Sequence, residues 1–176
     1  MPARNLSRVA LFAALMAICS WISIPAPVPF TLQTFAVFLA PALLGGKMGT
    51  IAVGTYLLLG AVGLPVFAGF SGGIGVLLGA TGGYLLGFLL TTLVVWLAEI
   101  ALGTSQPVFL ASALVGQGLC YLFGSVWYAL GYAGGTAGLP AVLSTCVLPF
   151  LLPDTAKLIL AWSLRKRLAP VLAKSR

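Results

Sequence analysis

Charged side chains are almost absent from the long central part of this sequence. Between residues 8 and 165 there are only four, Lys47, Glu99, Asp154 and Lys157. A soluble domain carries roughly a quarter charged residues because water must solvate its surface, whereas 6% of this chain is charged and 61% is hydrophobic. These proportions exclude a soluble domain, a disordered chain and a coiled coil. They predict an all-α integral membrane protein.

Proline and glycine clusters divide the apolar sequence into six runs. At roughly 20 residues per span, six spans use most of the 176 residues, so we expect residues 1–176 to form a single membrane domain. We expect residues 9–24 to be the first span rather than a cleaved signal peptide, because the rest of the chain is equally apolar. The expected spans are residues 9–24, 31–44, 50–62, 80–102, 108–130 and 141–164.

The basic residues predict the orientation of these spans. Cytoplasmic loops carry an excess of Lys and Arg. If both termini are cytoplasmic, eight of the nine basic residues fall inside: Arg4, Arg8, Lys47, Arg165, Lys166, Arg167, Lys174 and Arg176. The net charge of +7 therefore marks topology rather than a nucleic-acid partner. With this orientation the Gly/Pro-rich segments 25–30 and 63–79 are outer loops that cap a substrate cavity open to the outside.

The ninth basic residue, Lys157, lies within the last expected span, three residues after Asp154. This spacing places both side chains on one helix face. Charges at membrane depth are costly and usually line a functional path, so the pair is the strongest candidate site. The alternative is an ion pair that only stabilises the helix bundle. Pro149 and Pro153 precede it, and they can bend the helix and free backbone carbonyls.

Small residues form two further patterns. Gly75, Gly79, Gly83 and Gly87 recur at four-residue intervals, which favours close helix packing. Ala10 and Ala14, with Ala13 and Ala17, form two similar pairs in the first span, and one such face can dock a second membrane protein. The isolated cysteines Cys19, Cys120 and Cys146 are interpreted as packing residues. Glu99 is expected near the cytoplasmic end of its span, within reach of the lipid headgroups.

Several kinds of chemistry lack the residues that they require. The chain has no histidine and only two acidic residues, so it offers little for acid–base or metal catalysis. Lys47 lacks the glycine and the Ser/Thr of a phosphate-binding loop, and the Gly-rich runs do not match a dinucleotide fingerprint. We therefore expect no enzyme activity, no ATP hydrolysis by this chain, and no cofactor or metal.

Four stretches together match a specific pattern. They are residues 27–40 (PVPFTLQTFAVFLA), 56–69 (YLLLGAVGLPVFAG) and 72–88 (GGIGVLLGATGGYLLGF), followed late in the chain by Pro153-Asp154-x-x-Lys157. The sequence resembles the BioY family, the biotin-binding membrane subunits (S components) of energy-coupling-factor (ECF) vitamin transporters. Ala80 departs from the proline that the family usually has there. No arginine lies between Arg8 and Arg165 to line a pocket.

The resemblance implies a high-affinity biotin-binding subunit with six helices in the bacterial plasma (inner) membrane. It implies that a transmembrane coupling protein and a pair of ATPases energise uptake in trans. Asp154 and Lys157 would contact biotin, and the face containing Ala10 and Ala14 would meet the coupling protein. Alternatives are an S component for another small vitamin, or a membrane scaffold in which the Asp–Lys pair is structural.

The candidate residues suit the chemistry of biotin. Asp154 can accept from the ureido N–H groups, and Lys157 can donate to either the ureido oxygen or the carboxylate. Backbone N–H groups at Gly72 and Gly73, with the Thr81 hydroxyl, are candidates to hold the other end. Phe30 and Tyr84 are candidates for an apolar wall. Gln33, which lies in the first matching stretch, completes the set of expected ligand-binding residues.

Overall fold

The computed structural model describes residues 3–26, 28–132 and 138–174. These residues are mainly helical. The helices are α1 (Ala3–Trp21), α2 (Gln33–Leu44), α3 (Gly46–Ala61), α4 (Ile74–Leu77), α5 (Gly82–Leu102), α6 (Gln106–Tyr132), α7 (Leu139–Cys146) and α8 (Leu148–Lys174). A 3-10 turn, η1 (Ala68–Phe70), precedes α4, and the short strands β1 (Ser23–Ile24) and β2 (Phe30–Thr31) form an antiparallel pair.

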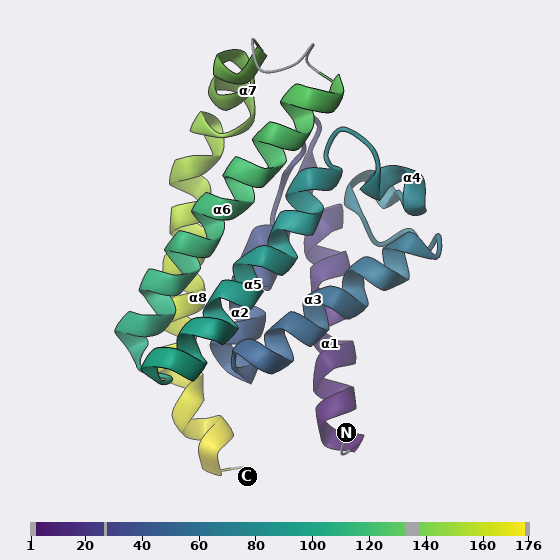
Figure 1. Ribbon diagram of the computed structural model, residues 1–176. Coiled ribbons are helices and arrows are strands. Elements are labelled where there is room, and N and C mark those ends of the chain that lie inside the picture. The colour runs from purple at the N-terminus through teal and green to yellow at the C-terminus, as the bar shows by residue number, and fades with distance from the viewer. Residues whose placement is uncertain (1–2, 27, 133–137, 175–176) are drawn as a thin grey trace.

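The long helices form one bundle (Figure 1). The start of α1 and the end of α8 lie at the same end of it, together with the α2–α3 and α5–α6 turns. The helices α4 and α7 lie at the opposite end. The Gly-rich segment before α5 is therefore separated from the helix ends that carry most of the basic residues.

Three helices, α1, α5 and α6, are each long and apolar enough to cross a membrane. The bent pair of α7 and α8 counts as a fourth if the two helices form one span. The chain is therefore a multi-pass membrane protein. With 12 residues in α2 and 16 in α3, these two helices are short for a crossing. The count of six crossings stays a prediction.

The last expected span, residues 141–164, is divided between two helices. It is broken at Val147 (φ −123°, ψ −56°), where α7 and α8 meet at 42°. Pro149 accounts for the break, because proline has no N–H for the helix ladder and its ring clashes with the carbonyl four residues earlier. Proline is tolerated in the first turn of a helix, and α8 accordingly restarts one residue before it.

Glycines allow α5 and α6 to pack closely. A Cβ atom on Gly87 would lie 2.6 Å from Cys120 Sγ, and one on Gly124 would lie 2.2 Å from the Tyr84 ring. Side chains at these positions would force the two helices apart. The expected close packing is therefore present. Gly75 and Gly79, however, precede α5, so they are not part of this contact.

The two alanine pairs of α1 face in different directions. Ala13 and Ala17 are buried in the bundle core. Ala10 and Ala14 are exposed, beside Leu11, which is 66% exposed. The exposed pair therefore remains available for contact with another protein.

Two charged side chains form hydrogen bonds with turns between helices: Glu99 with the α2–α3 turn and Arg165 with the α5–α6 turn. Glu99 is half-buried, and its Oε2 accepts a hydrogen bond of 2.6 Å from the backbone N–H of Gly46. Glu99 lies near the end of α5, as expected, and its carboxylate caps α3. Its contact with the lipid headgroups stays a prediction. Arg165 is buried, donates to the Thr104 carbonyl at 2.8 Å, and lies 4.7 Å from the Phe109 ring centroid. It joins α8 to the α5–α6 turn.

Candidate ligand-binding site

A cavity of about 200 Å³ lies within the bundle. Its walls come from the residues around β2, from segment 67–81, and from helices α2, α5, α6, α7 and α8. Segment 67–81 contributes Phe67, Ala68, Ser71, Val76 and Thr81. The Gly-rich stretch therefore forms one wall of the cavity.

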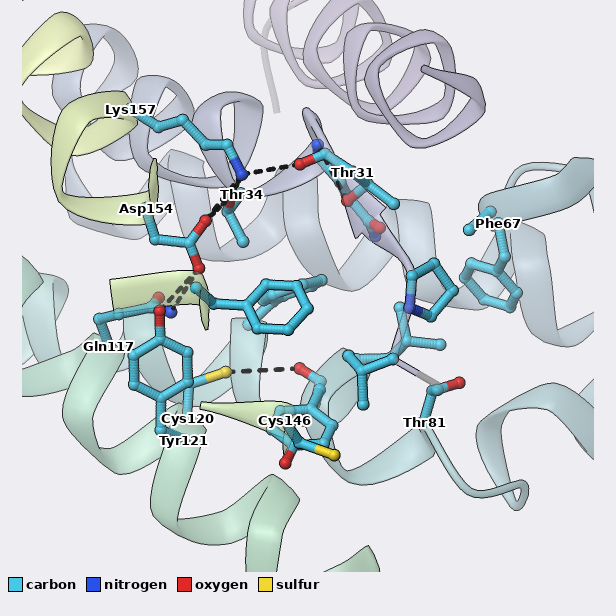
Figure 2. Close-up of a pocket in the computed structure, with 18 of the residues that line it drawn as sticks. Thr31, Thr34, Phe67, Thr81, Gln117, Cys120, Tyr121, Cys146, Asp154 and Lys157 are labelled. Carbon is cyan, nitrogen blue, oxygen red and sulfur yellow. Dashed lines mark hydrogen bonds and ion pairs between the residues drawn. The ribbon is translucent and has the colours of Figure 1, made fainter. Parts of the chain in front are cut away.

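The Asp154 carboxylate accepts four hydrogen bonds at one side of this cavity (Figure 2). Its Oδ1 accepts from Lys157 Nζ at 2.7 Å and from Thr34 Oγ1 at 2.8 Å. Its Oδ2 accepts from the Tyr121 hydroxyl at 2.7 Å and from Gln117 Nε2 at 3.3 Å. The side chain is only 4% exposed. A buried charge of this kind is tolerated only because it is both paired and hydrogen-bonded.

Lys157 has three hydrogen-bond acceptors. Besides Asp154, its Nζ donates to Thr34 Oγ1 at 3.0 Å and to the Thr31 carbonyl at 2.7 Å. The same Nζ lies 4.8 Å from the centroid of the Phe30 ring, within the range of a cation–π contact. Because an ammonium group has three protons, the side chain is fully satisfied within the protein.

Three helices bring these groups together. Asp154 and Lys157 lie one turn apart on α8, just after the break at Val147. Thr34 lies in the first turn of α2, and Gln117 and Tyr121 lie four residues apart on α6. Residues at this spacing share a helix face, so α6 presents both of them to Asp154.

The rest of the cavity is largely apolar. Phe67, Tyr84, Leu85, Phe88 and Phe150 line it. Phe150 also stacks on Phe30 with ring centroids 5.3 Å apart. A mostly apolar pocket with a few convergent polar groups is typical of a site for a small organic ligand. The ion pair supplies both an anionic acceptor and a cationic donor at one place in it.

Nothing in the described ranges resembles a metal centre. No group of three or more His, Cys, Asp or Glu side chains there is arranged to hold a metal ion. Cys120 and Cys146 line the cavity, and both are buried, free thiols.

The whole helical chain matches a known protein family. The model of the BioY family matches residues 1–174. The chain belongs to the BioY family. Its relatives include a protein from Thermotoga maritima named "Biotin transporter BioY", which is 46% identical over 167 residues, 94% of this chain and 95% of the relative. A "Probable biotin transporter BioY" from Pyrococcus horikoshii is 41% identical, with 96% and 98% of the two chains covered.

A solved structure has the same fold. It is the crystal structure of the S-component for biotin from an ECF-type ABC transporter, and it superposes with a TM-score of 0.80 and 31% sequence identity. The match covers 95% of this chain and 91% of the solved chain. The helical arrangement of this BioY protein is therefore that of an ECF S component.

The structure brings most of the expected ligand-binding residues together. Asp154, Lys157, Thr81, Tyr84 and Gln33 all line the cavity of this BioY chain. Their contact with a ligand stays a prediction, although their convergence on one cavity is consistent with it.

Three expected residues lie elsewhere. Phe30 is not among the lining residues, although its ring contacts two of them, Phe150 and Lys157. Gly72 and Gly73 are not among the lining residues. A Cβ on Gly72 would lie 2.2 Å from the carbonyl oxygen of Leu64, and Gly73 has φ +98°. Glycine is therefore required at both positions: at residue 72 because a side chain would clash with Leu64, and at residue 73 because of the positive φ.

Several polar groups of the site were not predicted from the sequence. They are Thr31, Thr34, Gln117 and Tyr121. The spacing of Gln117 and Tyr121 within an apolar span was the available signal, because polar side chains inside a span usually face the bundle. Cys120 and Cys146 were interpreted as packing residues, and they are buried, but they also form part of the cavity wall.

Proposed function

We propose that this BioY protein binds biotin with high affinity and mediates its uptake. The observation that carries the proposal is the buried pair of Asp154 and Lys157, 2.7 Å apart, on the wall of a largely apolar cavity. The names of its relatives, and the biotin S-component with the same fold, point to the same ligand.

Biotin and the cavity are chemically complementary. Its fused ring and valeryl chain fit the apolar walls, and its ureido N–H groups are donors for Asp154. Lys157 donates to a ligand oxygen, in place of its present bond to the Thr31 carbonyl. Thr81 offers a further hydroxyl at the wall formed by segment 67–81. Hydrogen bonds to charged groups contribute roughly 1.5–3 kcal/mol each, which suits tight binding of a small ligand.

Energy for uptake comes from partner subunits in this proposal. The sequence has no phosphate-binding loop, so ATP acts only through an ECF ATPase pair, linked by a transmembrane coupling protein. Ala10 and Ala14 are exposed small residues on α1, and they are the proposed contact with that coupling protein. In this proposal the chain itself needs neither a cofactor nor a catalytic residue.

The proposed setting is the bacterial plasma (inner) membrane. Six crossings with both termini in the cytoplasm place Arg4, Arg8, Lys47 and the C-terminal basic cluster inside, in agreement with the positive-inside rule. The cavity wall formed by segment 67–81 then faces outward. Biotin enters from outside, and the ECF module drives its release inward.

Biotin titration of the purified full-length chain, by calorimetry or Trp fluorescence, tests the proposal. We expect tight binding that Asp154→Asn weakens at least about tenfold. Other small vitamins serve as competitors, and binding of one of them instead of biotin would indicate an S component for that vitamin. No binding of any of them by a demonstrably folded chain would favour a scaffold in which the pair is structural.

A further inference from the structure

One polar group that lines the cavity is a side-chain amide of which, within the described ranges, only the nitrogen makes a hydrogen bond. Gln33 lies at the start of α2, is 3% exposed and lines the cavity. Its Nε2 donates to the Tyr56 hydroxyl at 2.8 Å. Within the described ranges, no donor reaches its Oε1. Unlike the oxygens of Asp154, this acceptor has no partner in that part of the protein.

The hydrogen bonds of the Tyr56 hydroxyl determine the orientation of the Gln33 amide. Tyr56 is completely buried on α3 and is not part of the cavity lining. Its hydroxyl donates its single proton to the Val66 carbonyl at 3.0 Å. The oxygen can then only accept from Gln33, so the NH₂ group must face Tyr56. As long as Tyr56 donates to Val66, the reversed amide would place two acceptors against each other.

The surroundings hold Tyr56 in place. Its ring meets Phe67 edge-on, with centroids 5.5 Å apart (Phe67 is labelled in Figure 2). The Ser20 hydroxyl of α1 lies 2.6 Å from the Val66 carbonyl oxygen and 2.7 Å from the Ala17 carbonyl oxygen, so its single proton is shared between them. The Val66 carbonyl therefore keeps a second hydroxyl within hydrogen-bond distance when the Tyr56 hydroxyl is removed.

We propose that Tyr56 is a positioning residue that turns the Gln33 carbonyl oxygen toward the cavity, where it accepts a hydrogen bond from a ligand N–H group. This inference rests on the proposed function, since it concerns recognition within the same site. It makes Gln33 a determinant of specificity for a cyclic urea over an analogue in which the N–H is methylated. A site built to bond an N–H rejects the analogue because its buried acceptor is then left unpaired.

The test is a double-mutant cycle on the full-length chain, with biotin Kd measured by calorimetry. Gln33→Met removes the acceptor and keeps an unbranched side chain, and we expect a loss of about tenfold. Tyr56→Phe removes only the hydroxyl, and we expect a loss of about three- to tenfold. The double variant should bind no worse than Gln33→Met, because Tyr56 acts through Gln33. Thr55→Val, the control next to Tyr56 on α3, removes a hydroxyl that bonds to the Ile51 carbonyl of the same helix, and it should change Kd less than about twofold.

Ligand analogues identify the bond. The two biotin isomers methylated at one ureido nitrogen are titrated against wild type and Gln33→Met. Wild type should discriminate against both isomers, and Gln33→Met should lose most of its discrimination against one of them. A purely structural role of Gln33 would weaken all three ligands equally.

Different failures have different meanings. Unchanged biotin Kd in Gln33→Met, additive losses in the cycle, or equal weakening of the three ligands overturns the inference. Gln33→Met leaves the bond between Tyr56 and Val66 in place, so this variant tests the inference even if Tyr56→Phe does not fold. Absence of biotin binding by folded wild type overturns instead the proposed function.

Discussion

Tyr121 and Asp154 are joined by a hydrogen bond of 2.7 Å between the phenol hydroxyl and Oδ2. This bond comes from α6, whereas Oδ1 is held by Thr34 of α2 and by Lys157 of α8 itself. Donors on three helices therefore fix one carboxylate. The orientation of Asp154 depends on how these helices pack, and not on α8 alone.

Tyr121→Phe should therefore weaken biotin binding without unfolding the protein. Loss of one hydrogen bond to a charged group costs roughly 1.5–3 kcal/mol. We expect biotin Kd to rise about tenfold in calorimetric titration. The matched control is Tyr128→Phe, because within the described ranges the Tyr128 hydroxyl makes no hydrogen bond. An unchanged Kd in Tyr121→Phe would mean that this bond does not contribute to the site.

Lys157→Met should both destabilise the protein and abolish biotin binding. Removal of one partner leaves the Asp154 charge buried and uncompensated, which costs about 3–5 kcal/mol. The double variant Asp154→Asn/Lys157→Met should recover most of the stability, because no lone charge remains, yet it should not recover binding. Thermal unfolding in detergent and biotin titration measure the two effects. Wild-type biotin affinity in the double variant would contradict a ligand-binding role of the pair.

The main features of the fold were predictable from breaker residues. Proline and glycine clusters located most helix ends within a few residues, because a helix cannot continue through them. Pro149 and Pro153 indicated that the last span can bend, but the apolar run around Pro149 has no glycine or polar cluster that would locate the break at Val147. Only the structure shows that α8 restarts just before this proline.

The charged part of the site was predictable, and the neutral part was not. Asp154 and Lys157 stand out because charges are rare in a membrane span. Gln117 and Tyr121 lie more than 30 residues away in sequence, and no local pattern indicates that α6 packs against this part of α8. Gly72 and Gly73 resembled a ligand-binding loop in sequence. Neither lines the cavity, and the Gly73 N–H donates to the Gly60 carbonyl at 2.7 Å.

Gly124→Ala should damage the cavity through the contact between α5 and α6. The added Cβ would lie 2.2 Å from the Tyr84 ring, and Tyr84 lines the cavity. Overpacking of this kind costs typically about 1–3 kcal/mol, and we expect biotin affinity to fall as Tyr84 shifts. Gly118→Ala on the same helix is the control, since nothing lies within 4 Å of its Cβ position. It should be neutral, or more stable by about 0.5–1 kcal/mol.

Glu99→Gln should lower stability without changing the ligand site. The carboxylate accepts from the Gly46 N–H at 2.6 Å, where a negative charge also favours the start of α3. A neutral amide keeps the acceptor and loses the charge, so we expect a loss of about 1 kcal/mol in thermal unfolding. Biotin Kd should stay within about twofold, because Glu99 is not part of the cavity and distant sites act independently. A large loss of biotin affinity at unchanged stability would contradict this assignment.

Large residues on the two faces of α1 should have opposite effects. Ala14 is exposed and Ala13 is 2% exposed. Ala14→Trp should therefore fold and bind biotin normally, yet block uptake by cells that co-express an ECF module, because a bulky side chain prevents close approach of a partner helix. Ala13→Trp should overpack the core by about 1–3 kcal/mol and reduce the amount of folded protein. Radiolabelled biotin uptake, normalised to the amount of folded protein in the membrane, separates the two. Normal uptake by Ala14→Trp would place the partner contact on another surface.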